Sequence, residues 1–137
     1  MNNRFVFDTS AILTLIELEA GADQLKEIVL AAINRSTEIL GCFVSLTEVE
    51  YIARQEEGED FACRRMADLH SLPIQWVHSD EALCASAAKL KAAHRISFAD
   101  AFVAATAIRF DATLVHKDPE FLPLAPTLRQ LALPPKN

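Results

Sequence analysis

The chain has 137 residues, of which 51% are hydrophobic and only 3 are glycine, and this composition excludes a disordered chain and predicts one compact domain over residues 1–137. Its formal net charge of -6 argues against a protein that binds nucleic acid through its overall field, because such binding relies on basic surfaces. The charge does not exclude an enzyme that cuts nucleic acid at a local site where acidic side chains hold cations.

The cysteines and histidines do not form the pattern of a zinc site. Cys42, Cys63 and Cys84 are an odd number without a Cys-x-x-Cys pair, and their apolar neighbours predict reduced core thiols in a cytoplasmic protein. The four histidines never fall four residues apart. No apolar run approaches the roughly 20 residues of a membrane span, and the first residues lack the pattern of a signal peptide, so we expect no membrane association.

Apolar runs and helical periodicity alternate along the chain. Residues 4–10 are predicted to be a buried strand that ends on Asp8, Thr9 and Ser10, and a helix follows at once. The remaining predicted helices and strands, in chain order, are helices 10–19 and 22–34, strand 39–44, helices 45–57 and 59–70, strand 74–77, helices 80–93 and 97–110, strand 112–115 and a short strand near 128–131.

The predicted strands are continuously apolar rather than alternating, which is typical of strands covered on both faces. Strands that alternate with helices predict an α/β fold with right-handed crossovers. We therefore expect a mostly parallel central sheet of four or five strands, flanked by helices.

Acidic side chains follow several of these strands. Asp8 follows the first strand, Glu48 the second and Asp118 the fourth, while Asp100 lies near the start of a helix. The carboxyl ends of parallel strands share one edge of a sheet, where ligands bind in α/β proteins. Carboxylates gathered there repel one another unless cations bind between them. An oxygen-only ligand set favours Mg²⁺ or Mn²⁺, which are the usual ions of phosphodiester hydrolysis.

Each acid also has a purely structural interpretation. Asp8 or Thr9 is a suitable helix N-cap, and the pairs Ser45 with Glu48 and Ser97 with Asp100 have capping-box spacing. Helical periodicity argues for more than capping at Asp100, because it shares a column with Ala104 and Ala107 and so faces protein. Glu48 lies at the border between the polar and apolar sides of its helix, as a residue that lines a cleft does, whereas Glu50 lies on the solvated side.

Four motifs in order resemble the PIN-domain ribonucleases, and within them the VapC-type toxins of toxin–antitoxin systems. They are Phe5–Leu13, Ser45–Tyr51, Ser97–Phe102 and Leu114–Phe121, and together they span nearly the whole chain. The resemblance implies that Asp8, Glu48 and Asp100 are catalytic and bind the metal, and that Asp118 supports it directly or through water. It also implies that Ser10, beside Thr9, orients Asp8, and that the chain forms a homodimer inhibited by a small antitoxin.

One departure from the family pattern lies near the last acid. The family commonly has a small hydroxyl residue two positions before that acid, and His116 stands there in this chain. Without that hydroxyl, either the acidic side chains are held less firmly or His116 contacts the substrate. Lys117 and Arg95 are further candidate contacts for RNA phosphates, and Lys117 is a candidate to stabilise the leaving oxygen. Ordinary loop chemistry at a strand end is the alternative for His116 and Lys117.

The favoured hypothesis is a metal-dependent endoribonuclease with RNA as substrate and an antitoxin as partner. A phosphoacceptor signalling domain needs an acidic pair after the first strand, and the chain has only Asp8. A phosphatase of the haloacid-dehalogenase type fails in a similar way, because Ser10 stands where a second Asp is needed. A PIN-fold binding module without catalysis stays open because of His116.

Overall fold

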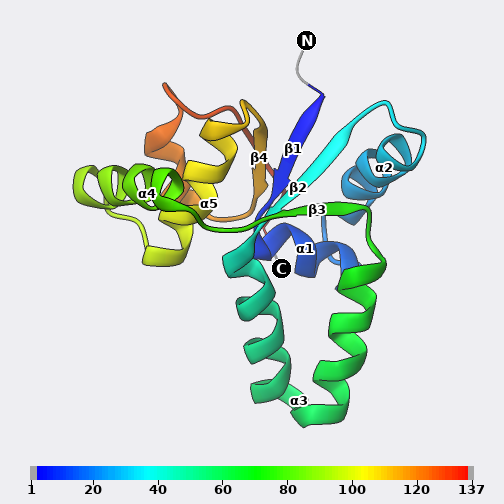
Figure 1. Ribbon diagram of the computed structural model, residues 1–137. Coiled ribbons are helices and arrows are strands. Elements are labelled where there is room, and N and C mark those ends of the chain that lie inside the picture. The colour runs from blue at the N-terminus through cyan, green and yellow to red at the C-terminus, as the bar shows by residue number, and fades with distance from the viewer. Residues whose placement is uncertain (1–2, 136–137) are drawn as a thin grey trace.

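The protein is an α/β structure with a five-stranded, all-parallel sheet, seen in a computed structural model that describes residues 3–135 (Figure 1). The strand order is β3-β2-β1-β4-β5, which confirms the fold class predicted above. The strands are β1 (Arg4–Phe7), β2 (Glu38–Cys42), β3 (Ile74–Val77), β4 (Thr113–His116) and β5 (Gln130–Ala132).

Helices cover both faces of this sheet, which explains why its strands are apolar on both sides. Figure 1 shows α4 and α5 on one side and α1 and α2 on the other, with α3 extending away from the sheet. The helices are α1 (Thr9–Glu17), α2 (Ala22–Ile33), α3 (Phe43–Ser71), α4 (Glu81–Ala93), α5 (Phe98–Arg109) and the 3₁₀ helix η1 (Pro119–Leu124).

The hydrophobic core divides into two clusters, one on each face of the sheet. Successive side chains of a strand point to opposite faces. In β1, Val6 packs with Leu114 and the residues of α5, whereas Phe7 packs with Val115 and the residues of α1. The two clusters hold the sheet between its helical layers, and this packing fixes the positions of the carboxyl ends of the strands.

Several element boundaries differ from the prediction, and those of β2 and β5 differ for identifiable reasons. β2 ends at Cys42 and α3 begins at Phe43, because Phe43 and Val44 pack as a helical turn on the core cluster beneath α5, with the rings of Phe43 and Phe102 5.3 Å apart. A continuous apolar run does not reveal where a strand ends and a buried helix begins. β5 covers residues 130–132 rather than 128–131, since Leu128 is buried in the core before the strand starts.

The two predicted helices 45–57 and 59–70 form one helical hairpin, α3. Gly58 has φ of 85° and ψ of -169°, and this non-helical residue turns the chain between the two arms. Glycine adopts a positive φ without the steric cost that a side chain brings. Figure 1 shows the hairpin extending away from the sheet, and a side chain added at Gly58 would meet no other atom within 4 Å.

The prediction that all three cysteines are core thiols is wrong for two of them. All three are free, but only Cys42 is buried, while Cys63 and Cys84 lie on exposed faces of α3 and α4. Apolar neighbours in sequence did not reveal their exposure, since adjacent residues of a helix point in different directions. Within residues 3–135, no helix has the length and apolar character needed to cross a membrane.

The strand order places a crevice beside β1. From β1 the chain continues to β2, which pairs with β1 on one side, whereas β4 pairs with β1 on the other side. At such a reversal of strand order, the helices that follow neighbouring strands lie on opposite faces, and a crevice opens outside the carboxyl ends. Residues that follow β1, β2 and β4 therefore meet at this point.

Candidate metal centre

Asp8 follows β1 and is held in place by two hydrogen bonds. It is 4% exposed, and its Oδ1 accepts from Ser10 Oγ at 2.7 Å and from the Ala11 amide at 2.8 Å. The second bond makes Asp8 the N-cap of α1. Asp8 therefore caps this helix and is also part of the site. Ser10 Oγ in turn accepts from the Lys117 amide at 3.0 Å, which ties the end of β4 to Asp8.

Glu48 is tied to the same strand end through Thr9. Thr9 Oγ1 donates to Glu48 Oε1 at 2.6 Å and lies 2.9 Å from Ser45 Oγ. Ser45 is buried within the first turn of α3, whose N-cap is Cys42, so the predicted capping box at Ser45 is absent from this helix. Its hydroxyl instead joins α3 to the start of α1.

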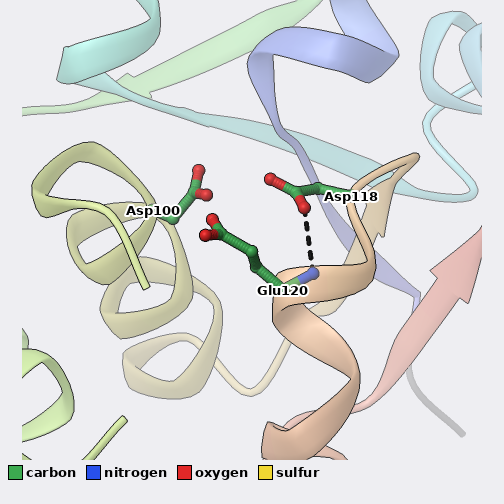
Figure 2. Close-up of side chains that lie close together, drawn as sticks. All are labelled: Asp100, Asp118 and Glu120. Atoms are coloured by element: carbon green, nitrogen blue, oxygen red, sulfur yellow. Dashed lines mark hydrogen bonds between the residues drawn. The ribbon is translucent and has the colours of Figure 1, made fainter. Parts of the chain in front are cut away.

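Asp100 lies in the first turn of α5, on the opposite side of the crevice. Ser97 Oγ caps this helix by accepting from the Asp100 amide at 3.1 Å. The Asp100 side chain is half-buried and faces Asp118 and Glu120, as Figure 2 shows. Capping by Ser97 therefore fixes the backbone of Asp100 and leaves its carboxylate directed into the crevice.

Asp118 and Glu120 supply the remaining carboxylates from the start of η1 (Figure 2). Asp118 Oδ1 accepts from the Glu120 amide at 2.9 Å, which turns Glu120 back toward Asp100. One carboxylate oxygen from each of Asp100, Asp118 and Glu120 lies within 4.8 Å of the others. Glu120 was not among the predicted site residues, although an acid just after an Asp-Pro helix start was a usable signal.

These side chains line one cleft of about 420 Å³. Its walls are acidic and hydroxyl-bearing, with two apolar side chains from α1 and α3. The lining residues are Asp8, Thr9, Ser10, Leu13, Glu48, Ile52, Ser97, Asp100, Asp118 and Glu120. The three acids predicted from the strand ends and Asp100, predicted from its helix, thus line one cleft together with Glu120.

Ionisation of Asp8 and Asp100 is unfavourable in the cleft, because both groups are removed from water and lie near other carboxylates. Burial is the main cause that raises the pKa of Asp8 to about 7, and the nearby charges of Asp118 and Glu48 raise it further. Burial likewise raises the pKa of Asp100 to about 8, with contributions from hydrogen bonds to Asp118 and Glu120. Ionising all of these carboxylates near neutral pH is therefore costly unless a cation binds between them. A divalent ion with a preference for oxygen ligands fits this donor set.

None of the three predicted substrate contacts, His116, Lys117 and Arg95, is among the residues that line the cleft. Lys117 does not line the cleft, and its side chain is 10% exposed, with Nζ 3.9 Å from Glu19 Oε1. His116 is 1% exposed, and both of its ring nitrogens are hydrogen-bonded within the protein. Contact between substrate and either side chain therefore needs these arrangements to open. Arg95 is exposed in the loop that precedes α5.

A model of the PIN domain family matches residues 5–125, and the chain belongs to this family. A search of curated proteins finds no match. A chain of the VapBC2 complex of Rickettsia felis bound to promoter DNA has a similar fold, with a TM-score of 0.77 and 17% identity over 96% of this chain and 99% of that one.

Two further solved structures have the same fold. A chain of the DNA-bound VapBC complex of Salmonella typhimurium has a TM-score of 0.72 and 17% identity, and the match covers 96% of this chain and 98% of that one. VapC20 of Mycobacterium tuberculosis, described as a toxin that cleaves the sarcin–ricin loop, has a TM-score of 0.57 and 17% identity over 80% of this chain and 86% of that one. At these identities the matches establish the fold.

We predict that Asp100→Asn stabilises the metal-free protein at alkaline pH. The pKa of Asp100 is about 8 in the folded chain and near 4 when unfolded, so folding retains a proton between these values. Stability is therefore lost as the pH rises through this range, and Asn removes this loss. In EDTA, the melting temperature of Asp100→Asn should match that of the wild-type protein at about pH 5 and exceed it at about pH 8.5.

Glu50→Gln is the matched control, because Glu50 bonds Arg54 on the exposed side of α3. Its melting temperature should follow that of wild type at both values of pH. A loss of stability in Asp100→Asn at alkaline pH would contradict a site strained by carboxylate repulsion and would leave helix capping as the main role of Asp100.

Proposed function

We propose that the protein is a divalent-metal-dependent endoribonuclease of the VapC type, the toxin of a toxin–antitoxin pair. The observation that carries the proposal is the meeting of Asp8, Glu48, Asp100, Asp118 and Glu120 in one acidic cleft at the carboxyl edge of the sheet. Membership of the PIN domain family and likeness to VapBC structures support the same conclusion.

The ion in this proposal is Mg²⁺ or Mn²⁺, held by the predicted ligands Asp8, Glu48, Asp100 and Asp118, with Glu120 as a further ligand because its carboxylate lies near those of Asp100 and Asp118. A bound divalent ion supplies charge for the phosphate and lowers the pKa of water, which produces a nucleophile at neutral pH. The carboxylates bind and orient the ion, and their raised pKa values mean that binding releases protons. Ser10 and Thr9 hold Asp8 and Glu48 in place through the hydrogen bonds described above.

RNA must reach the cleft despite the acidic surface of the protein. Arg95 is exposed just before the first turn of α5 and is the candidate that the fold best supports for a phosphate contact. Lys117 is paired with Glu19, so we no longer assign it to the leaving oxygen. That VapC20, a structural neighbour, is described as an RNA-cleaving toxin supports RNA as the substrate class.

We expect the purified chain to cleave RNA with Mg²⁺ or Mn²⁺ and to be silent in excess EDTA. Asp8→Asn, Asp100→Asn and Asp118→Asn each remove a ligand charge, and several kcal/mol of lost stabilisation corresponds to a fall in rate of roughly a hundredfold or more. Initial rates on a labelled single-stranded RNA measure this effect. Glu50→Gln should cleave like wild type.

Two outcomes would count against this mechanism. Cleavage that persists in EDTA would exclude a metal-dependent reaction. An inactive wild-type chain with its metal bound would favour the alternative of a PIN-fold binding module without catalysis.

A small antitoxin is the partner that we propose. The cleft has an apolar wall made by Leu13 and Ile52, and the side chains of Leu18, the C-cap of α1, and Tyr51 of α3 are exposed. A partner with an apolar segment covers such a surface, and a basic side chain beside it enters the acidic cleft. The homodimer expected from the family resemblance stays a prediction.

We predict that Mg²⁺ and the antitoxin compete. If a Lys or Arg of the antitoxin enters the cleft, both ligands need the same negative potential. The affinity of the chain for an antitoxin with such a side chain should therefore fall as Mg²⁺ rises at constant ionic strength, measured by calorimetry. Affinity that does not respond to Mg²⁺ would place the partner outside the cleft.

A further inference from the structure

Behind the acidic cleft, a chain of hydrogen bonds connects the loop of Asp118 to β5. The ring of His116 packs on Phe121, with ring centroids 4.9 Å apart. His116 Nδ1 accepts from the Asp118 amide at 3.0 Å, and Nε2 lies 2.8 Å from Gln130 Oε1. Gln130 Nε2 donates to the carbonyl of Phe121 at 2.7 Å. The side chains of His116 and Gln130 are called the His116–Gln130 relay below.

The backbone groups at its two ends determine the direction of every bond in the relay. The Asp118 amide can only donate, so His116 Nδ1 carries no proton and Nε2 is the donor to Gln130 Oε1. The amide group of Gln130 is thereby oriented with its NH₂ toward Phe121, whose carbonyl can only accept. Both ends lie in residues 118–121, so the relay closes a loop around the segment that carries Asp118 and Glu120.

This segment needs a restraint, because its carboxylates repel one another. Carboxylate oxygens of Asp118, Glu120 and Asp100 lie within 4.8 Å of one another, and a free loop relieves that repulsion by moving outward. The bond from the Asp118 amide to His116 joins residues two apart, as Asn and Asp side chains do in turns. His116 differs from those shorter side chains in that its far nitrogen also reaches Gln130 in β5.

We propose that His116 and Gln130 are positioning residues of the divalent-cation site, which hold Asp118 and Glu120 at the spacing that the cation needs. This inference rests on the proposed metal-dependent function. It makes β5, which contributes no side chain to the lining of the cleft, a part of the site. The relay touches neither RNA nor the ion, so its effect is on how tightly the ion binds.

The test is the affinity of the full chain for Mn²⁺, measured by calorimetry below the melting temperature of each variant. His116→Phe keeps a ring against Phe121 and removes both hydrogen bonds, and Gln130→Met keeps the length of the side chain and removes its polar atoms. Loss of groups that orient metal ligands costs roughly 10- to 100-fold in affinity, and we expect at least tenfold for each variant. His116→Asn keeps an acceptor for the Asp118 amide and should recover part of the loss.

Thr106→Val is the matched control, because Thr106 is buried in α5 and donates to the carbonyl of Phe102 at 2.8 Å, away from the cleft. Thr106→Val should lower the melting temperature and leave the Mn²⁺ affinity unchanged. The same result is expected for His116→Phe if the role of His116 is purely structural. Wild-type affinity in folded His116→Phe and Gln130→Met would overturn the inference. If His116→Phe does not fold, Gln130→Met decides alone. A wild-type chain that binds no Mn²⁺ would contradict the proposed function itself.

Discussion

Repulsion between carboxylates confined at one edge of the sheet is the constraint on which the rest of this structure depends. Asp8 and Asp100 approach each other from opposite sides of the crevice, and burial raises the pKa of each, with the neighbouring carboxylates adding to the cost of ionising both. A protein that needed only stability would not place these groups together, because neutral side chains of the same size would pack there at lower cost. The arrangement is understandable if a cation offsets the repulsion.

Much of the hydrogen bonding around the cleft serves to hold these groups against that repulsion. Ser10 joins Asp8 to the backbone of β4, Thr9 joins α1 to Glu48, and Ser97 fixes the first turn of α5. Each of these side chains lies at the start of a helix or directly after a strand. The fold thus supplies the edge at which the acids meet, and short polar side chains supply the restraint.

The strand-end argument located Asp8, Glu48 and Asp118 from sequence because it needs only the order of elements and the parallel direction of the strands. Asp100 was located by helical periodicity. Glu120 was missed because its direction depends on the turn made by Asp118, which no periodicity reveals. The placement of His116 and Lys117 was open to prediction from alternation along β4. His116 shares a face with Leu114 and packs on Phe121 of the same core cluster, whereas Lys117, just after β4, continues the face of Val115 and reaches Glu19 after α1. The exposure of Cys63 and Cys84 was beyond such reasoning, since it depends on how each helix rotates against its neighbours.

The central claim is that the acidic cleft binds a divalent ion between the two sides of the crevice. Anomalous diffraction from crystals grown with Mn²⁺ tests it most directly, because the peak locates the ion without reference to activity. The account predicts a peak within the cleft, with oxygens of Asp8, Asp100 and Asp118 around it. A cleft without a peak in crystals that hold Mn²⁺ elsewhere would contradict the account.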